Sequence, residues 1–411
     1  MLKENLIMKL KRMLVSAATC ILLSSCGGSD LLTAGIGGGG IGGTGISMGT
    51  ITGFGSIWVN GVRYDVSNAS FTRDGVSVSG QGDYRIGEVV TITGSVNADG
   101  VSGVANSVEY DDSLEGTVSA ASTDGETLSV LGVTVRVDAL TLLHGFNALT
   151  DLQAGNVVEI SGYKQQDTIR ATSIILKQAT FTDNQSTIEI KGTVSDVDLV
   201  AKTFKLGTLV VDYASASLSM PNNLVTAGQF VEVKSRQAPQ GNRLIASEVE
   251  LENEYPNYGS GQEVELEGLV TSFSSILQFS VNGQPTTTNA STTYEYGLAS
   301  DVQLNSLVEV KGTINSNGVL LAEEVSLKQG NQSDSLEIEG RITTIDLAAM
   351  TLMVNGVTIS VDNHTSLFDE INDRYVTIQL SDLKVNDYVE VDSSLLSDGR
   401  TLALKIERES P

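Results

Sequence analysis

Gly155-Asn-Val-Val-Glu-Ile-Ser-Gly162 is the stretch that decides the fold, because four other stretches of the chain repeat its pattern. The counterparts are Gly87-Glu-Val-Val-Thr-Ile-Thr-Gly94, Gly228-Gln-Phe-Val-Glu-Val-Lys234, Asn305-Ser-Leu-Val-Glu-Val-Lys-Gly312 and Asn386-Asp-Tyr-Val-Glu-Val-Asp392. Apolar and polar residues alternate in each stretch, which is typical of a strand with one buried face. The same strand therefore occurs five times.

Two further signatures flank this strand in the same order in every copy. The opening signatures are Gly49-Thr-Ile51, Gly116-Thr-Val118, Gly192-Thr-Val194, Gly268-Leu-Val270 and Gly340-Arg-Ile342. The closing signatures are Ala105-Asn-Ser-Val108, Ala171-Thr-Ser-Ile174, Ala246-Ser-Glu-Val249, Ala322-Glu-Glu-Val325 and Ala403-Leu-Lys-Ile406. A repeat of about 70 to 75 residues indicates tandem units of one architecture.

Hairpin turns lie between the opening and central signatures. They read Asn60-Gly61, Asn282-Gly283 and Asn355-Gly356, with Leu131-Gly132 and Leu206-Gly207 in the other two copies. Asn-Gly favours a two-residue hairpin because both residues accept positive φ. Each unit thus has five short strands, with a variable connection between the third and fourth.

This strand order predicts an all-β fold, a tandem array of five small OB-like five-stranded barrels. Closure of each barrel removes the exposed edges that an open sheet would present. No stretch keeps a 3.6-residue apolar period, so helices are expected to be one or two turns long. The expected units are residues 46–112, 113–180, 186–253, 262–329 and 335–411.

The amino-terminal residues 1–25 have the pattern of a secretory signal. Basic residues at Lys9, Lys11 and Arg12 precede an apolar run that ends at Leu23 and is too short for a permanent membrane span. Met8 is an alternative start, because the basic region is complete without the first seven residues.

Leu23-Ser24-Ser25-Cys26 resembles the bacterial lipobox, whose Cys is lipidated on sulfur and becomes the new amino terminus. The alternative is a plain signal peptide with an incidental Cys26. Gly27 rather than Asp follows the Cys, which in Gram-negative bacteria usually accompanies transfer to the outer membrane. We therefore expect lipidation at Cys26, a Gly-rich tether over residues 26–45, and a lipid-anchored location in the cell envelope.

The composition excludes several classes of function. A formal net charge of -25 opposes the binding of nucleic acid, which needs Lys and Arg to neutralise phosphates. Cys20 would leave with the signal and Cys26 would carry lipid, so no disulfide or thiolate metal site is expected.

No catalytic constellation stands out. His144 and His364 occupy non-equivalent places in different units, so we expect no catalytic or metal-binding pair. The acidic groups at Tyr110-Asp-Asp112, at Asp369-Glu370 with Asn372-Asp373, and at Asp196 with Asp198 match no calcium-loop pattern. We favour a solvated acidic face over calcium ligands, and we expect no metal, no cofactor and no catalytic residue.

Aromatic side chains of the first unit are the candidates for ligand binding. They are Phe54, Trp58 and Tyr64, with Phe71 nearby, and Trp58 is the only Trp in the chain. Packing in the core is the favoured role for Trp58. The alternative is an exposed platform that stacks on a ligand.

Gly42-Gly-Thr-Gly-Ile46 and Gly49-Thr-Ile-Thr-Gly-Phe-Gly-Ser-Ile-Trp-Val-Asn-Gly-Val-Arg-Tyr-Asp65 resemble the amino-terminal part of bacterial lipoproteins built from the domain of unknown function DUF5666. The resemblance covers almost the whole chain after the signal and is expected to be strongest in residues 46–115. It implies a repeated small β-barrel with no assigned catalytic residue. Ser235 and Ser393 depart from the pattern, because a closing Gly stands there in the other copies.

Together these observations predict an exported, lipid-anchored envelope protein that acts as a non-catalytic binding or spacer module. The expected partners are the membrane, through the lipid on Cys26, and a glycan or an envelope protein. The alternative is an envelope hydrolase with a carboxylate site at an interface between units.

Overall fold

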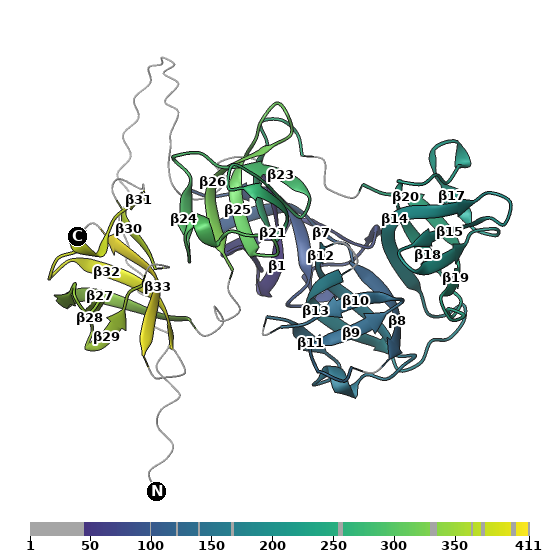
Figure 1. Ribbon diagram of the computed structural model, residues 1–411, viewed down its shortest axis with the longest axis horizontal. Coiled ribbons are helices and arrows are strands. Elements are labelled where there is room, and N and C mark those ends of the chain that lie inside the picture. The colour runs from purple at the N-terminus through teal and green to yellow at the C-terminus, as the bar shows by residue number, and fades with distance from the viewer. Residues whose placement is uncertain are drawn as a thin grey trace, which may run out of the picture. The chain divides into compact units, whose positions relative to one another are not determined.

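Strands and tight turns make up the computed structural model (Figure 1). It describes residues 45–98, 100–120, 122–138, 140–165, 168–253, 258–328, 335–362, 365–370, 375–395 and 400–409. The predicted signal peptide, Cys26 and His364 lie outside the described residues.

The first barrel contains the strands β1 (Gly45–Gly53), β2 (Ile57–Val59), β3 (Val62–Asp65), β6 (Val89–Val96) and β7 (Ser102–Tyr110). β1, β2 and β3 pair antiparallel in succession, and β3 pairs parallel with β7. β7 pairs with β6, and β6 returns to β1, so the five strands close a ring. This is the strand order of an OB-like barrel, which confirms the predicted fold class.

The connection between β3 and β6 contains the short strands β4 (Ser70–Arg73) and β5 (Val76–Ser77) and a single 3-10 turn, η1 (Gln81–Asp83). β4 pairs parallel with the far end of β7, so the variable connection is held against the barrel.

Four further segments repeat this arrangement. In the second barrel, the strands are β8 (Leu114–Ala120), β9 (Thr127–Val130), β10 (Val133–Arg136), β12 (Val157–Gln165) and β13 (Thr168–Gln178), with β11 (Leu142–His144) and η2 (Leu149–Asp151) in the connection. In the third, they are β14 (Ile188–Asp198), β15 (Thr203–Leu206), β16 (Leu209–Asp212), β18 (Phe230–Ser235), β19 (Arg243–Ile245) and β20 (Glu248–Leu251), with β17 (Ser217–Ser219) and η3 (Pro221–Asn223).

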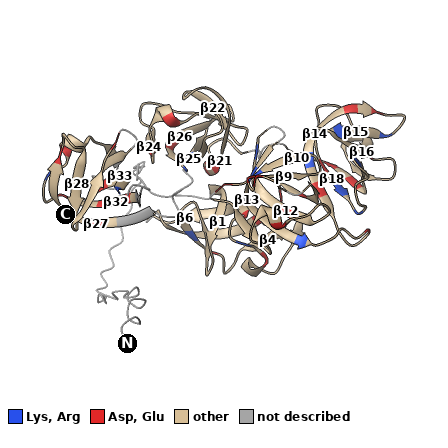
Figure 2. Cartoon of the chain, turned by 60° about the horizontal axis from the view of Figure 1, so that its bottom comes forward, with Lys and Arg blue, Asp and Glu red and all other residues tan. Residues whose placement is uncertain are grey.

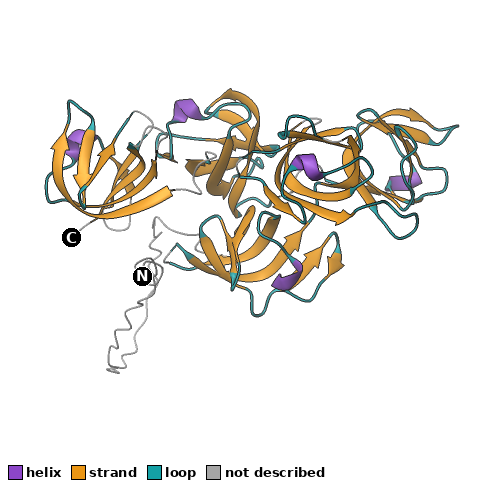
Figure 3. Ribbon diagram, turned by 90° about the horizontal axis from the view of Figure 1, so that it is seen from below, coloured by secondary structure: helices purple, strands orange, loops and turns teal. Residues whose placement is uncertain are grey.

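The fourth barrel contains β21 (Glu263–Ser275), β22 (Gln278–Val281), β23 (Gln284–Thr287), β25 (Leu307–Ile314) and β26 (Leu320–Leu327), with β24 (Thr293–Glu295) and η4 (Ala299–Asp301). The fifth contains β27 (Ser335–Asp346), β28 (Thr351–Val354), β29 (Val357–Ser360), β32 (Tyr388–Leu395) and β33 (Thr401–Glu409), with β30 (Ser366–Glu370), β31 (Tyr375–Thr377) and η6 (Leu380–Asp382). Figure 3 shows the strands curled into small barrels, with short helices beside them.

The hairpin Asn explains why the opening Gly recurs. Asn60 adopts a φ of 52° and Gly61 a φ of 75°, as the two-residue turn requires. The Asn60 side chain folds back over β1, where its Nδ2 donates to Ser47 Oγ at 3.1 Å and to the Met48 carbonyl at 3.2 Å. A Cβ on Gly49 would lie 2.0 Å from Asn60 Oδ1, so only Gly leaves room for this amide.

The closing Gly has a similar steric origin. A Cβ on Gly94 would lie 2.3 Å from the Val104 carbonyl oxygen, beside the bulge between β6 and β7. Where Ser235 replaces this Gly, its Oγ donates to the Ile245 carbonyl at 2.7 Å, and the final strand is divided into β19 and β20. Ser393 keeps the bulge without dividing β33.

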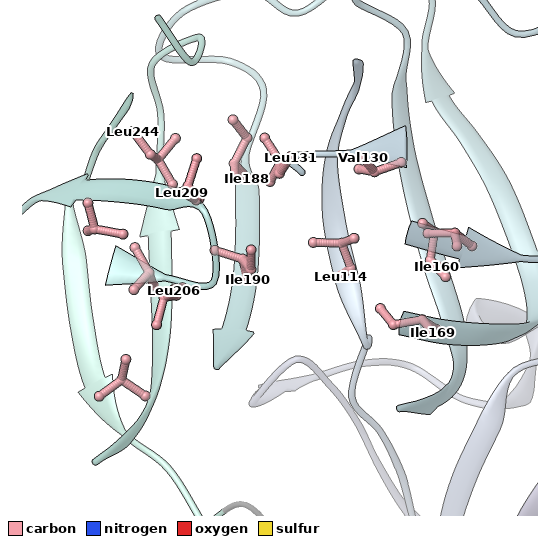
Figure 4. Packing of buried hydrophobic residues seen from close by; sticks show 14 of the residues in the cluster. Leu114, Val130, Leu131, Ile160, Ile169, Ile188, Ile190, Leu206, Leu209 and Leu244 are labelled. Atoms are coloured by element: carbon pink, nitrogen blue, oxygen red, sulfur yellow. The ribbon is translucent and has the colours of Figure 1, made fainter. Parts of the chain in front are cut away.

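Each barrel is filled by the apolar residues that alternate along its strands. The first, fourth and fifth barrels have their own buried clusters. One cluster extends through the second and third barrels, and Leu114, Ile188 and Ile190 lie where these two meet (Figure 4).

Candidate functional site at the barrel junctions

Two pairs of barrels are joined through their first strands. β8 of the second barrel pairs antiparallel with β14 of the third, with Leu114 opposite Ile190. β1 of the first barrel pairs parallel with β21 of the fourth, with Ser47 opposite Glu265. A tandem array leads one to expect contacts between sequential neighbours only. The pairing of β1 with β21 instead joins two barrels that are distant in the sequence.

Residues of the first, second and fourth barrels meet around Tyr163. Its ring packs in a small apolar cluster with Val89, Leu269 and Leu307. Its hydroxyl donates to Glu267 Oε1 at 2.6 Å, and Thr50 Oγ1 donates to the same oxygen at 2.7 Å. Three barrels therefore share one partly buried network.

An Arg from the first barrel enters the junction with the second. Arg73, at the end of β4, contacts Glu88 at 3.0 Å through Nη1 and Glu159 at 2.5 Å through Nη2. Both carboxylates are almost fully buried, with 0% and 1% of the residue exposed. The guanidinium carbon lies 4.1 Å from the centre of the Tyr110 ring, and the Tyr110 hydroxyl donates to Glu159 at 3.0 Å. The buried charges of Arg73, Glu88 and Glu159 are thus paired and hydrogen-bonded, which offsets the free-energy cost of removing them from water.

The environment shifts the ionisation of these groups. Burial disfavours the charge on Arg73, but Glu159 and Glu88 outweigh it and raise the pKa of Arg73. Burial raises the pKa of Glu115 on β8 to about 7, although Lys177 nearby lowers it. Lys177 contacts Glu159 as well.

A second group of charges lies at the junction between the second and third barrels. Lys191 Nζ on β14 lies 2.8 Å from Asp111, 3.2 Å from Glu232 and 3.2 Å from the Asp112 carbonyl oxygen. Burial and the neighbouring Glu232 raise the pKa of Glu189 to about 9. Figure 2 colours the acidic and basic residues, and both kinds lie near β4, β12 and β18.

The three aromatic candidates of the first barrel fall in two environments. Phe54 and Trp58 are 39% and 38% exposed, so the expectation that Trp58 packs in the core is wrong. Trp58 lies opposite Arg63 on the hairpin formed by β2 and β3, with its ring against Gly53. Tyr64 is 2% exposed and belongs to the core of the barrel, so it cannot stack on a ligand at the surface. Alternation along β2 and β3 turns Trp58 outward and Tyr64 inward.

The other candidate groups are also placed by the structure. His144 contacts the Ile86 carbonyl oxygen through Nε2 at 2.9 Å. Asp198 accepts two backbone N–H groups in its exposed loop, as expected for a solvated acidic residue. Asp112, however, is 3% exposed, so the expectation of a solvated acidic face is wrong for this residue. The packing of the third barrel over the segment that links the first two covers it.

Sequence reasoning missed the buried carboxylates of the junctions. Glu159, Glu232 and Glu309 occupy the same position of the repeated Val-Glu strand and are 1%, 5% and 8% exposed. The sequence signal that could have identified these carboxylates is a Glu that recurs on the outer face of the same strand. Its burial depends on a neighbouring barrel, which the local pattern does not reveal.

Within the described residues, no helix is long and apolar enough to cross a membrane. No curated protein matches the chain. A solved structure named "drosophila Unr CSD456" is 12% identical, with coverage of 54% of this chain and 96% of that chain and a TM-score of 0.13.

The model of a family described as a domain of unknown function, DUF5666, matches residues 115–175, 191–250, 267–326 and 339–407. All four matches lie after the first barrel, so the expectation that the resemblance is strongest in residues 46–115 is wrong. The matches fall on the second to fifth barrels and together span more than half of the chain. The chain therefore belongs to the DUF5666 family.

Proposed function

We propose that the protein is an exported, lipid-anchored envelope protein that acts as a non-catalytic spacer and presents a binding hairpin on its first barrel. The observation that carries the spacer role is the joining of barrels through shared sheets, β1 with β21 and β8 with β14. A spacer needs joints that resist bending, and strand pairing supplies backbone hydrogen bonds across each of these joints.

The charges at the junctions support a structural role for these carboxylates. Glu88 and Glu159 are held by Arg73, and Glu159 also accepts from Tyr110. A catalytic carboxylate must reach a substrate, whereas Glu159 is 1% exposed and covered by the first barrel.

The anchor rests on Leu23-Ser24-Ser25-Cys26, which lies outside the described residues. Metabolic labelling with an alkyne fatty acid, followed by membrane fractionation, tests it. We expect label and membrane association in the natural chain and neither in Cys26→Ser. A labelled Cys26→Ser protein would contradict the anchor.

The proposal of a binding hairpin is based on Phe54 and Trp58. Their exposed rings face solvent from neighbouring positions of the first barrel. Stacking of a sugar or peptide on an aromatic ring suits a glycan or an envelope protein as partner. Because Trp58 is the only Trp, its fluorescence reports binding directly. We would titrate the full chain with soluble peptidoglycan fragments and with envelope extract.

Trp58→Ala should abolish binding measured by calorimetry while leaving the circular dichroism spectrum unchanged. Phe273→Ala is the matched control, because Phe273 is 36% exposed at the related hairpin of the fourth barrel. Equal binding by Trp58→Ala and the natural chain would exclude the hairpin as the binding site.

A hydrolase with carboxylates at a barrel junction is the second candidate. Carboxylates do meet there, and the pKa of Glu115, about 7, is that of an effective general acid. Release of reducing ends from envelope glycans by the natural chain, lost in Glu115→Gln, would favour this candidate over the spacer.

A further inference from the structure

Three carboxylates from different parts of the chain converge beside the junction of the second and third barrels. Asp74 lies in the turn between β4 and β5, Asp112 lies between β7 and β8, and Glu189 lies on β14. One oxygen of each lies within 4.8 Å of the others. Oxygens that share one Ca²⁺ are each 2.3–2.6 Å from the ion and so lie at most about 5 Å apart.

Two of these side chains have a buried oxygen without a hydrogen bond. Asp112 is 3% exposed and Glu189 is 5% exposed. Within the described part of the chain, Asp112 Oδ1 and Glu189 Oε1 accept no hydrogen bond. The ammonium group of Lys191 lies 3.6 Å from Glu189 Oε1, beyond hydrogen-bonding distance, and bonds instead to the Asp112 carbonyl oxygen. A buried acceptor without a hydrogen bond raises the free energy of the folded state. We therefore expect a bound ligand at these oxygens.

The charge balance around the group points to a cation. The carboxylates gathered here are Asp74, Asp111, Asp112, Glu189 and Glu232, and the ammonium groups beside them are Lys191 and Lys234. Arg73 adds a positive charge near Asp74, so five carboxylates face three cations, and only Asp111 of the five is exposed.

We propose that Asp74, Asp112 and Glu189 bind a divalent cation, with Ca²⁺ as the preferred ion. All three ligands are hard carboxylate oxygens, which suit Ca²⁺, Mg²⁺ or Mn²⁺ rather than a soft metal. Ca²⁺ fits best because it accepts irregular geometry, and these ligands come from three separate segments. The bound ion ties the first barrel, the linking segment and the third barrel together.

The site is complete only when the barrels are docked, so the ion would stabilise the docked arrangement. Binding to the folded chain alone raises its stability by mass action. This proposal is independent of the hairpin at Trp58 and of lipid at Cys26, so the failure of either leaves it intact.

Calorimetry of the chelator-treated full chain with CaCl₂, MgCl₂ and MnCl₂ tests the site. We expect saturable Ca²⁺ binding, a higher Tm in Ca²⁺, and weaker binding of Mg²⁺. Asp112→Asn and, separately, Glu189→Gln should each lower the Ca²⁺ affinity at least about tenfold, because each removes a charged ligand. Glu109→Gln is the matched control: it removes one charge from an exposed position of β7 and should leave binding unchanged.

Several outcomes would overturn the proposal. One is the absence of Ca²⁺ binding and of any Tm change in the natural chain. Another is a Ca²⁺ affinity that is unchanged in both Asp112→Asn and Glu189→Gln but reduced in Glu250→Gln. That result would place the ion at the neighbouring group of Glu232, Glu250 and Glu252. A higher Tm of Asp112→Asn without any effect of Ca²⁺ would show that a proton, not a metal ion, neutralises the site. Circular dichroism verifies that each variant is folded.

Discussion

At the residue scale, the first, fourth and fifth barrels share a steric match between a Gly on the first strand and the Asn of the following Asn-Gly turn. The Asn60 amide occupies the volume that a side chain at Gly49 would need. The same contact recurs between Gly268 and Asn282, where an added Cβ would lie 2.1 Å from the amide nitrogen. Two signatures that look independent in the sequence are therefore one motif.

Gly49→Ala tests this match. The added methyl group would displace the Asn60 amide and break its bonds to Ser47 and Met48, so we expect a loss of about 1–3 kcal/mol in the free energy of unfolding. Gly82→Ala is the control, because a Cβ there meets no atom within 4 Å. Urea unfolding measures both.

The double variant Gly49→Ala with Asn60→Gly should recover part of this loss, because Gly keeps the positive φ and removes the amide. If the losses of the two single variants simply add, the steric coupling is absent.

At the element scale, the repeated Val-Glu strand has two different faces. Its Val residues fill the barrel, and its Glu points outward into the junction with another barrel. Glu159, Glu232 and Glu309 all become buried in this way. The energetic cost of burying each carboxylate is offset by a nearby cation, namely Arg73, Lys191 and Lys328 respectively.

Arg73→Met tests the junction of the first and second barrels. The variant would leave Glu88 and Glu159 buried without their shared cation, so we expect a loss of about 3–5 kcal/mol. Arg63→Met, at an exposed position, should change stability by no more than about 0.5 kcal/mol. Thermal and urea unfolding measure both variants, and equal stability of the two would contradict a structural role for Arg73.

At the scale of the whole molecule, the contacts between barrels do not follow their order in the sequence. Ile46 and Met48 of the first barrel pack against the buried cluster of the fourth, and β1 pairs with β21. The chain is therefore not a simple row of units that each touch only their sequential neighbours.

Deletion of the first barrel, residues 45–112, tests this arrangement. We expect faster amide hydrogen exchange in β21 of the fourth barrel, because the deletion exposes an edge that β1 covers. Exchange in the fifth barrel serves as the internal reference. Unchanged protection of β21 would show that the first and fourth barrels are independent.

The pH dependence of stability also belongs to this scale, because the carboxyl groups that cause it lie at several junctions. Burial raises the pKa of Glu115 to about 7 and that of Glu265 to about 8. The folded chain therefore holds protons that the unfolded chain releases above its ordinary Glu pKa near 4.5. Stability should fall as the pH rises from about 4.5 to about 8, between the unfolded and folded pKa values of these groups.

Calorimetric unfolding at several pH values measures this trend. Glu265→Gln should make the fall shallower, because the amide keeps the acceptor of the Ser47 hydroxyl and cannot ionise. Glu323→Gln, which changes an exposed carboxylate of the same barrel, is the control. A Tm that rises over this pH range would contradict the expected sign.

The sequence by itself determined the local architecture: the repeat, the strands, the Asn-Gly hairpins and the OB-like closure. These features depend on period-two alternation and on turn chemistry, both of which are local. Only the tertiary structure decided that Asp112 and Glu159 are buried, that Trp58 is exposed, and that the first barrel meets the fourth. The reason is physical: alternation separates the inner from the outer face of a strand, but burial of an outer face depends on which barrel docks against it.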